Sequence, residues 1–326
     1  MTNFTLFSFG ALTVTAYGLL VALAAAVSGA YFLYRMRLAG ADADRSAVTL
    51  MIMAVSALAV SRLFYAVLNF DYLSDSLDQP LAVLRFWEGG FSYWGAAYGA
   101  FLAFYLRTFR SRNKKLGAFA LPAFMLFLAL MRLPEIFSSV GRGAPVEAEG
   151  VLASFPFALP DSGETPCAAI CVYELFFALL AFAASLLLLG RGAGKYVLRL
   201  PLAFYCLADV LLQSVRQDEN SYMMAGFVRI EQVLAMVLVG VIFIFSALEA
   251  FKRLPKARIK LIICSTVSAC AIAAGIACEY ALDAGNDSTA VYIVMTLFML
   301  AFFASCAVVA VSIPKEKTGL RRRRAA

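Results

Sequence analysis

The chain has 326 residues, of which 63% are hydrophobic, and its mean hydropathy is +0.82. Because a soluble globular chain is nearer half apolar, this composition excludes an ordinary soluble domain and predicts an all-α polytopic membrane protein. The 28 Lys and Arg outnumber the 21 Asp and Glu, and histidine is absent, which excludes histidine general bases, histidine-activated nucleophiles and histidine-ligated metals. We therefore expect no metal site and no cofactor.

Apolar runs long enough to cross the hydrocarbon core recur along the chain and predict about nine transmembrane helices. The expected spans are residues 12–34, 47–69, 91–108, 116–131, 169–189, 197–215, 227–251, 258–279 and 291–313. Basic residues gather in the loops 35–46, 107–115, 190–199 and 252–260, whereas the loops between these are acidic or sparsely charged. By the positive-inside rule, the N-terminus is then outside and the C-terminus is cytoplasmic.

Residues 132–168 form the longest non-apolar segment, and this topology places them on the outer side. Loops of this length are usually functional or disordered, and we expect a small extracytoplasmic cap here. Cys167 and Cys171 lie at the junction with the next span, and a disulfide between them is left open. The arginines at 321–324 follow a span, so they favour a cytoplasmic anchor near anionic lipid over a nucleic-acid partner.

Polar residues within or at the ends of the spans, with the glycines and the tryptophan beside them, are the candidate site residues. Ionisable groups are costly in a membrane and by default suggest a site. In chain order they are Arg62 in the second span, Glu88, Gly89, Gly90, Ser92, Tyr93, Trp94 and Gly95 where the third begins, Arg132 and Glu135 closing the fourth, Tyr173 and Glu174 beginning the fifth, and Asp209, Gln213 and Arg216 in the sixth. The last three share one helix face, at positions i, i+4 and i+7. Two arginines from different helices, with acids beside them, could hold a phosphate headgroup.

A structural reading competes for each of these residues. Arginine–acid pairs at helix ends are often locks or interface anchors. Gly95 and Gly99 form a GxxxG pattern, for which close helix packing is the favoured interpretation.

Several stretches follow one another in an order and spacing typical of one family. They are FSFG at 7–10, AYGL at 16–19, SRLFY at 61–65, RFWEGGFSYWGA at 85–96, FPFA at 155–158, VYE at 172–174 and VRQ at 215–217. Through them the chain, from about Phe4 to Phe251, resembles prolipoprotein diacylglyceryl transferases, bacterial membrane enzymes that attach diacylglycerol to a lipobox cysteine.

The resemblance implies a cavity in which phosphatidylglycerol meets the cysteine thiol of a lipoprotein precursor, with residues 85–96 lining it. It implies that Arg132 and Arg216 match the family's essential arginines and that Tyr17 matches its first-span tyrosine. The thiolate would attack the glyceryl carbon and glycerol phosphate would leave, which requires cations on the phosphate and a base for the thiol proton. Glu135, Glu174, Asp209 and Tyr93 are the base candidates, and the sequence leaves the choice among them open.

The chain also departs from the family pattern. Trp94 stands at the family's histidine, Glu135 replaces the first asparagine after Arg132, and Asp209 stands where the family often has arginine. The two arginines, Arg132 and Arg216, are kept, while the polar residues around them have changed. This pattern fits a divergent paralogue.

The expected organisation is a seven-helix transferase-like membrane domain at 1–251, two extra C-terminal helices at 252–314 and a basic cytoplasmic tail at 315–326. The favoured function is a diacylglyceryl transferase of the bacterial cytoplasmic membrane, with phosphatidylglycerol, a lipobox precursor and the bilayer as partners. Two alternatives remain: a catalytically degenerate paralogue that binds phospholipid without transfer, and a small-solute transporter.

Overall fold

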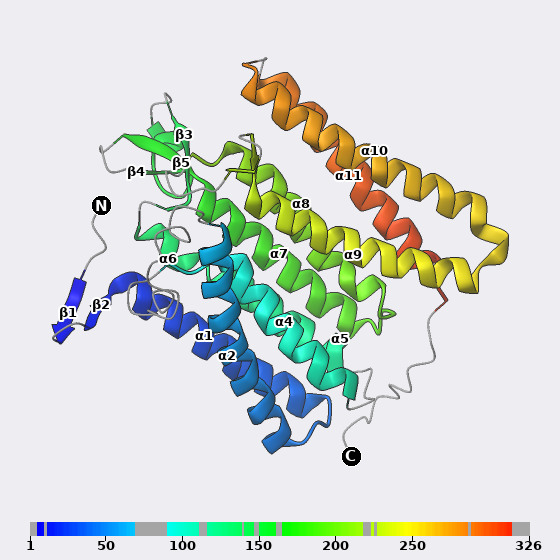
Figure 1. Ribbon diagram of the computed structural model, residues 1–326, viewed down its shortest axis with the longest axis horizontal. Helices are drawn as coiled ribbons and strands as arrows, with labels where there is room; N and C mark the ends of the chain where they lie inside the picture. Colours follow the sequence, from blue (N-terminus) through cyan, green and yellow to red (C-terminus); the bar gives the residue numbers. More distant parts are fainter. Residues whose placement is uncertain are drawn as a thin grey trace.

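The computed structural model describes residues 5–9, 12–68, 90–110, 116–138, 140–146, 150–160, 165–217, 223–224, 227–285 and 288–314. Its architecture is a bundle of long helices with small strand elements at one end (Figure 1). The long helices are α1 (Ala16–Leu38), α2 (Ala43–Leu68), α4 (Tyr93–Arg110), α5 (Leu116–Leu130), α7 (Ile170–Gly190), α8 (Leu200–Val215), α9 (Ile230–Arg253), α10 (Arg258–Asp283) and α11 (Ser288–Ser312). The all-α polytopic prediction is confirmed.

Eight of the helical segments in the described part of the chain are long and apolar enough to cross a membrane. The predicted span 91–108, which corresponds to α4, is not among them. Its 18 residues include Arg107, Thr108 and Arg110, and these polar side chains lower its hydropathy. The count of nine and the orientation of the termini therefore stay predictions.

The first helix begins later than the expected span at 12–34. Residues Leu12–Thr15 form strand β2, which pairs antiparallel with β1 (Thr5–Phe9). The helix starts at Ala16 because Thr15 caps it, its Oγ1 accepting from the Gly18 amide at 3.1 Å. This cap places Tyr17 in the first turn of α1.

A small antiparallel sheet in the order β3-β5-β4 lies at the end of the bundle near α6 (Leu133–Ile136) (Figure 1). Its strands are β3 (Arg142–Pro145), β4 (Ala158–Pro160) and β5 (Pro166–Ala169), with a 3-10 turn η3 (Gly150–Ala153) between β3 and β4. This sheet occupies the segment expected to form the cap. Cys167 and Cys171 are both buried free thiols, so they form no disulfide.

Helices α2 and α4 approach closely through the two glycines of the GxxxG pattern. A Cβ atom on Gly99 would lie 2.4 Å from the Ser56 carbonyl oxygen, and one on Gly95 would lie 2.8 Å from the Ser61 Cα. Ser56 Oγ donates to the Gly99 carbonyl at 2.9 Å. The packing interpretation of these glycines is therefore what the structure shows.

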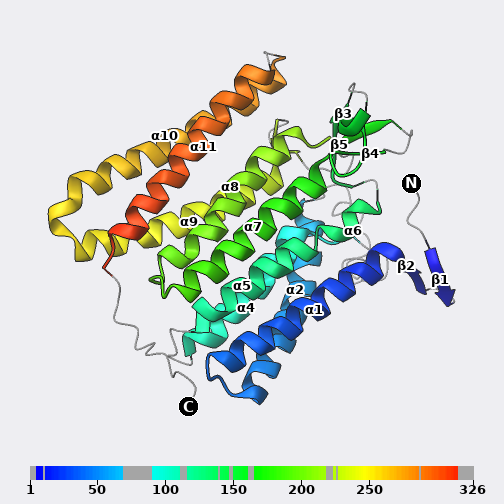
Figure 2. The same cartoon turned by 180° about the vertical axis from the view of Figure 1, so that it is seen from behind.

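The C-terminal helices α10 and α11 form a hairpin that lies along one side of the bundle, beside α8 and α9 (Figures 1 and 2). Two further elements precede α9: a short pair of strands, β6 (Met223–Met224) and β7 (Val228–Arg229). Helix α8 follows a 3-10 turn, η4 (Val197–Arg199), and α10 follows η5 (Pro255–Ala257).

Candidate functional site

A buried cluster of charges lies where the end of α5, α6, α7 and α8 meet. Arg132 is 1% exposed and stands at its centre. Its Nη1 lies 2.9 Å from Glu135 Oε1 and 3.0 Å from Glu174 Oε2, and its Nη2 lies 3.0 Å from Asp209 Oδ1. One guanidinium therefore meets three carboxylates through two of its nitrogens, as the fork of donors on an arginine allows.

Arg216 joins the same cluster from the C-terminal end of α8. Its Nη2 lies 3.4 Å from Glu135 Oε2, and its Nη1 lies 3.7 Å from Glu174 Oε1. Gln213, one turn earlier, donates to Glu174 Oε1 at 3.0 Å. The shared helix face expected for Asp209, Gln213 and Arg216 thus faces α6 and α7.

Two tyrosines, Tyr93 of α4 and Tyr205 of α8, complete this cluster. The Tyr93 ring lies under the Arg132 guanidinium at 3.9 Å from its centroid, and the Tyr93 and Tyr205 hydroxyls are 2.9 Å apart. Tyr205 also accepts from Arg132 Nη2 at 3.4 Å. Arg132 is therefore held by charge, by hydrogen bonds and by an aromatic face together.

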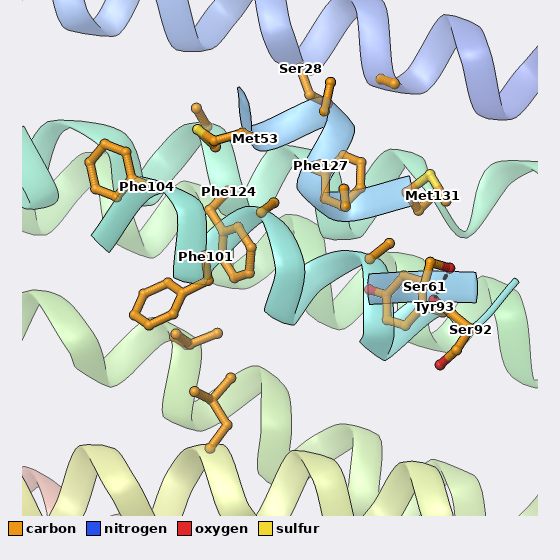
Figure 3. Close-up of a pocket in the computed structure, with 18 of the residues that line it drawn as sticks. Ser28, Met53, Ser61, Ser92, Tyr93, Phe101, Phe104, Phe124, Phe127 and Met131 are labelled. Atoms are coloured by element: carbon orange, nitrogen blue, oxygen red, sulfur yellow. Dashed lines mark hydrogen bonds between the residues drawn. The ribbon is translucent and has the colours of Figure 1, made fainter. Parts of the chain in front are cut away.

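The charge cluster borders a cavity of about 2270 Å³ lined by α1, α2, α4, α5, α8 and α9. Figure 3 shows Ser61, Ser92 and Tyr93 at one end and Phe101 and Phe104 at the other. Along α9 the lining runs from Glu231 to Phe245, a rise of roughly 21 Å. The cavity is larger than the ~300–1,000 Å³ of ordinary small-molecule pockets, and it combines a polar end with a long apolar body.

The predicted site residues divide between the cavity wall and the packing behind it. On the wall lie Tyr17, Gly90, Ser92, Tyr93, Arg132, Glu135, Gln213 and Arg216. Glu174 and Asp209 are fully buried behind them and reach the cavity only through the arginines they hold. The tertiary structure therefore brings together the residues of α1, α4, α6 and α8 that the sequence had singled out.

Arg62 lies outside this group and supports the backbone instead. Its Nη1 donates to the Gly90 carbonyl at 3.1 Å, and its guanidinium stacks on Tyr65. Gly90 has φ +73°, and a Cβ there would lie 2.5 Å from the Tyr65 ring, so this position requires glycine. Ser61 Oγ donates to the Ser92 carbonyl at 2.7 Å and fixes the segment that leads into α4.

Three further predicted site residues lie outside the cavity wall and make packing or backbone contacts. Trp94 is 1% exposed, packs in the hydrophobic core and is not part of the cavity wall. Tyr173 donates to the Phe157 carbonyl at 3.1 Å and so ties α7 to the small sheet. Gly95 packs against α2. Glu88 and Gly89, expected to bind substrate, lie outside the described residues.

Sequence reasoning missed Arg142, which organises the segment that carries Glu135. Its guanidinium donates to the backbone carbonyls of Ser138 at 2.6 Å, Val140 at 3.2 Å and Pro160 at 3.3 Å. Beside it, the Gln217 amide donates to the Arg142 carbonyl at 2.9 Å, which joins β3 to the end of α8. An arginine in a segment rich in Gly and Ser was the signal that the sequence offered, and its burial is known only from the structure.

Glu231, in the first turn of α9, was also missed. It lines the cavity together with Gln213 and Arg216. Its Oε2 is buried and has no hydrogen-bond partner in the part of the chain that the structure describes. Within that same part, no three Cys, Asp or Glu residues are placed to hold a metal ion.

Comparison with known proteins shows the family of the chain. A family model for prolipoprotein diacylglyceryl transferases matches residues 4–247. The chain belongs to this family. The match contains every residue that lines the cavity and ends before the α10–α11 hairpin.

Similar diacylglyceryl transferases occur in several bacteria. The phosphatidylglycerol–prolipoprotein diacylglyceryl transferase of Thermoanaerobacter sp. (strain X514) is 33% identical over 144 residues, which are 43% of this chain and 55% of that protein. The enzyme of the same name from Streptococcus pneumoniae serotype 4 is 27% identical over 205 residues, 60% of this chain and 74% of that protein. The chain thus spans about half the length of the first of these relatives.

Proposed function

We propose that the protein is a diacylglyceryl transferase of the bacterial cytoplasmic membrane, which moves diacylglyceryl from phosphatidylglycerol to the lipobox cysteine of a lipoprotein precursor. One observation carries the proposal: two arginines stand at the polar end of a long apolar cavity. A diacyl phospholipid has the same division, with an anionic headgroup joined to apolar chains. Membership of the family and the names of its relatives support this choice of substrates.

The reaction places different demands on the two ends of the cavity. The cysteine sulfur forms a bond to the glyceryl carbon, the bond from that carbon to the phosphate oxygen breaks, and glycerol phosphate leaves with the electron pair. Arg216 and Arg132, both on the cavity wall and both paired with Glu135, offset the charge that develops on the departing phosphate. The apolar body holds the acyl chains and so aligns the glyceryl carbon.

The thiol proton needs an acceptor, and Glu231 suits this role best. Glu135, Glu174 and Asp209 each lie within 3.0 Å of Arg132 and are engaged in that ion-pair cluster, and Glu174 and Asp209 are also fully buried behind the cavity wall. Glu231 lines the cavity with one carboxylate oxygen uncommitted within the described part of the chain. A base of this kind must lie within hydrogen-bond reach of the thiol it deprotonates.

The decisive test is an in vitro transfer assay with purified protein, phosphatidylglycerol and a lipobox peptide, followed by the mass of the peptide. We expect a diacylglyceryl mass gain that Arg216→Ala abolishes. Arg45→Ala is the matched control, because Arg45 is a highly exposed arginine that pairs with Asp42 and is not among the residues that line the cavity. No mass gain from the wild-type protein, with an ordinary family enzyme active alongside, would refute the proposal.

Arg216 is a better choice for this test than Arg132. Removal of Arg132 would leave three buried carboxylates without their shared cation. Breaking a buried ion pair in this way typically costs about 3–5 kcal/mol, so Arg132→Ala is expected to lose stability as well as activity.

Binding of phospholipid without transfer is the second candidate function. The carboxylates that surround Arg132 favour it. The cluster sets two arginines against three carboxylates, and Asp209 stands where the family often has a cation. Retention of phosphatidylglycerol through purification, lost in Arg216→Ala and without any peptide product, would establish this function in place of transfer.

A further inference from the structure

A second polar network lies on the side of α8 that faces away from the charge cluster, and it reaches the C-terminal hairpin. At its centre is Glu279 of α10, which is 8% exposed. Gln232 Nε2 donates to Glu279 Oε1 at 2.6 Å, and Ser214 Oγ donates to the same oxygen. A buried acid on a membrane helix is costly, and by default it suggests a functional role. Glu279 has two hydrogen-bond donors that offset part of this cost.

The network holds the last turn of α8 from three directions. Gln232 Nε2 also lies 3.1 Å from the Val210 carbonyl and 2.9 Å from Ser214 Oγ, so its two N–H groups are shared among three acceptors. Tyr292 of α11 donates to the Ser214 carbonyl at 3.3 Å. The Ser214 hydroxyl donates its one hydrogen to Glu279 and accepts a hydrogen bond from Gln232, so the three side chains form one connected network.

This last turn of α8 carries two residues of the candidate site. Gln213 and Arg216, on either side of Ser214, hold Glu174 and Glu135. The backbone around Arg216 is also fixed, since Arg229 Nη2 donates to its carbonyl oxygen and Gln232 Oε1 accepts from the Arg229 amide at 2.9 Å. Glu279 thus acts on the charge cluster from the opposite face of the same helix turn.

We propose that Glu279 is a positioning residue that fixes the end of α8, so that the C-terminal hairpin is a working part of the site. The hairpin lies beyond residues 4–247, which match the family, so this support is an addition to the matched domain. The effect on activity rests on the proposed transfer reaction. The effect on the order of α8 does not.

The test compares Glu279→Ala with Glu279→Gln and with Asp283→Ala. The glutamine keeps an oxygen that can accept from Ser214 and Gln232, whereas alanine removes it. Asp283 is an exposed acid one turn further along α10 and is the matched control. Two quantities are measured in each full-length protein: the transfer rate, and hydrogen–deuterium exchange over residues 210–217.

We expect Glu279→Ala to slow transfer by about tenfold or more and to raise exchange over 210–217, because small displacements of a site are costly. Glu279→Gln should stay within about twofold of wild type in both readouts, and Asp283→Ala should not differ from it. If Glu279→Ala does not fold, Ser214→Ala replaces it and should slow transfer by about fivefold, the effect of one lost hydrogen bond.

Two results would overturn the inference: wild-type exchange over 210–217 in the alanine variant, or a glutamine variant as impaired as the alanine one. A wild-type protein that transfers nothing would instead refute the proposed function. The exchange data alone would then decide whether Glu279 positions α8.

Discussion

The environment of each charged side chain decides what it can contribute. Arg45 and Asp42 are 3.9 Å apart and largely exposed, a kind of pair that contributes at most about 1 kcal/mol. Arg132 and its three carboxylates are almost fully buried, so each member depends on the others to offset its desolvation. Such a cluster fixes geometry, and Arg216 and Glu231 at its edge face the cavity.

At the residue scale, the prediction concerns Glu231. We expect Glu231→Gln to lower kcat by about 100-fold, because an amide cannot take the thiol proton while its shape and packing are kept. The melting temperature should stay within a few degrees of wild type. Transfer kinetics and thermal unfolding of the same preparation check both statements.

The control for this variant is Glu249→Gln, on the same helix near its other end, where Glu249 pairs with Arg253. It should keep wild-type kinetics. A Glu231→Gln protein with unchanged kcat would exclude Glu231 as the base and return the choice to Glu135, Glu174, Asp209 and Tyr93.

Helix contacts set the frame in which the charge cluster and the cavity exist. In a membrane, helices associate through close packing more than through burial of apolar surface, which makes small residues important at their interfaces. Helix α4 begins at Tyr93 with the Ser92 hydroxyl accepting from the Gly95 amide at 3.1 Å, and Gly95 and Gly99 then follow α2. The position of Tyr93 under Arg132 thus depends on the α2–α4 contact.

At the element scale, we expect Gly99→Ala to destabilise the protein by about 1–3 kcal/mol, because the added methyl would meet the Ser56 carbonyl at 2.4 Å and push the helices apart. Gly240→Ala, with no atom within 4 Å of the added methyl, should be neutral or stabilising by up to about 1 kcal/mol. Thermal unfolding in detergent measures both. Equal losses in the two variants would mean that the α2–α4 contact carries no special weight.

The whole molecule is arranged around the cavity. Six long helices and the short α6 contribute to its wall, and its length along α9 is roughly two thirds of the ~30 Å hydrocarbon thickness. The polar end lies near the small sheet, while the apolar body continues between the helices toward Phe245. This division predicts that chain length of the lipid matters for activity.

At this scale, the prediction is that Ala96→Phe lowers transfer from long-chain phosphatidylglycerol by about tenfold, because the ring occupies cavity volume next to the polar end. Transfer from a short-chain phosphatidylglycerol should fall much less. Ala59→Phe, at an exposed position of α2 outside the cavity wall, is the control. The ratio of the two rates is the measurement, and an equal loss for both lipids would contradict a chain-binding role for the cavity.

The sequence by itself determined the class of fold, the approximate span positions and much of the cluster. Apolar runs of membrane-spanning length form helices because their backbone groups must be satisfied internally in lipid. The spacing of Asp209, Gln213 and Arg216 placed them on one face, since helical periodicity is a local property. The start of α1 was wrong by four residues, because the cap by Thr15 outweighed the apolar run before it.

Only the tertiary structure decided which polar side chains meet. Glu231 and Gln232 are neighbours in sequence, yet one lines the cavity and the other joins Glu279 on the far side of α8. Arg62 and Trp94, predicted as site residues, contact a backbone turn and the core in the described part of the chain, and their role in binding stays a prediction. These assignments depend on the direction of each side chain between packed helices, and that direction is set by contacts between segments far apart in the chain.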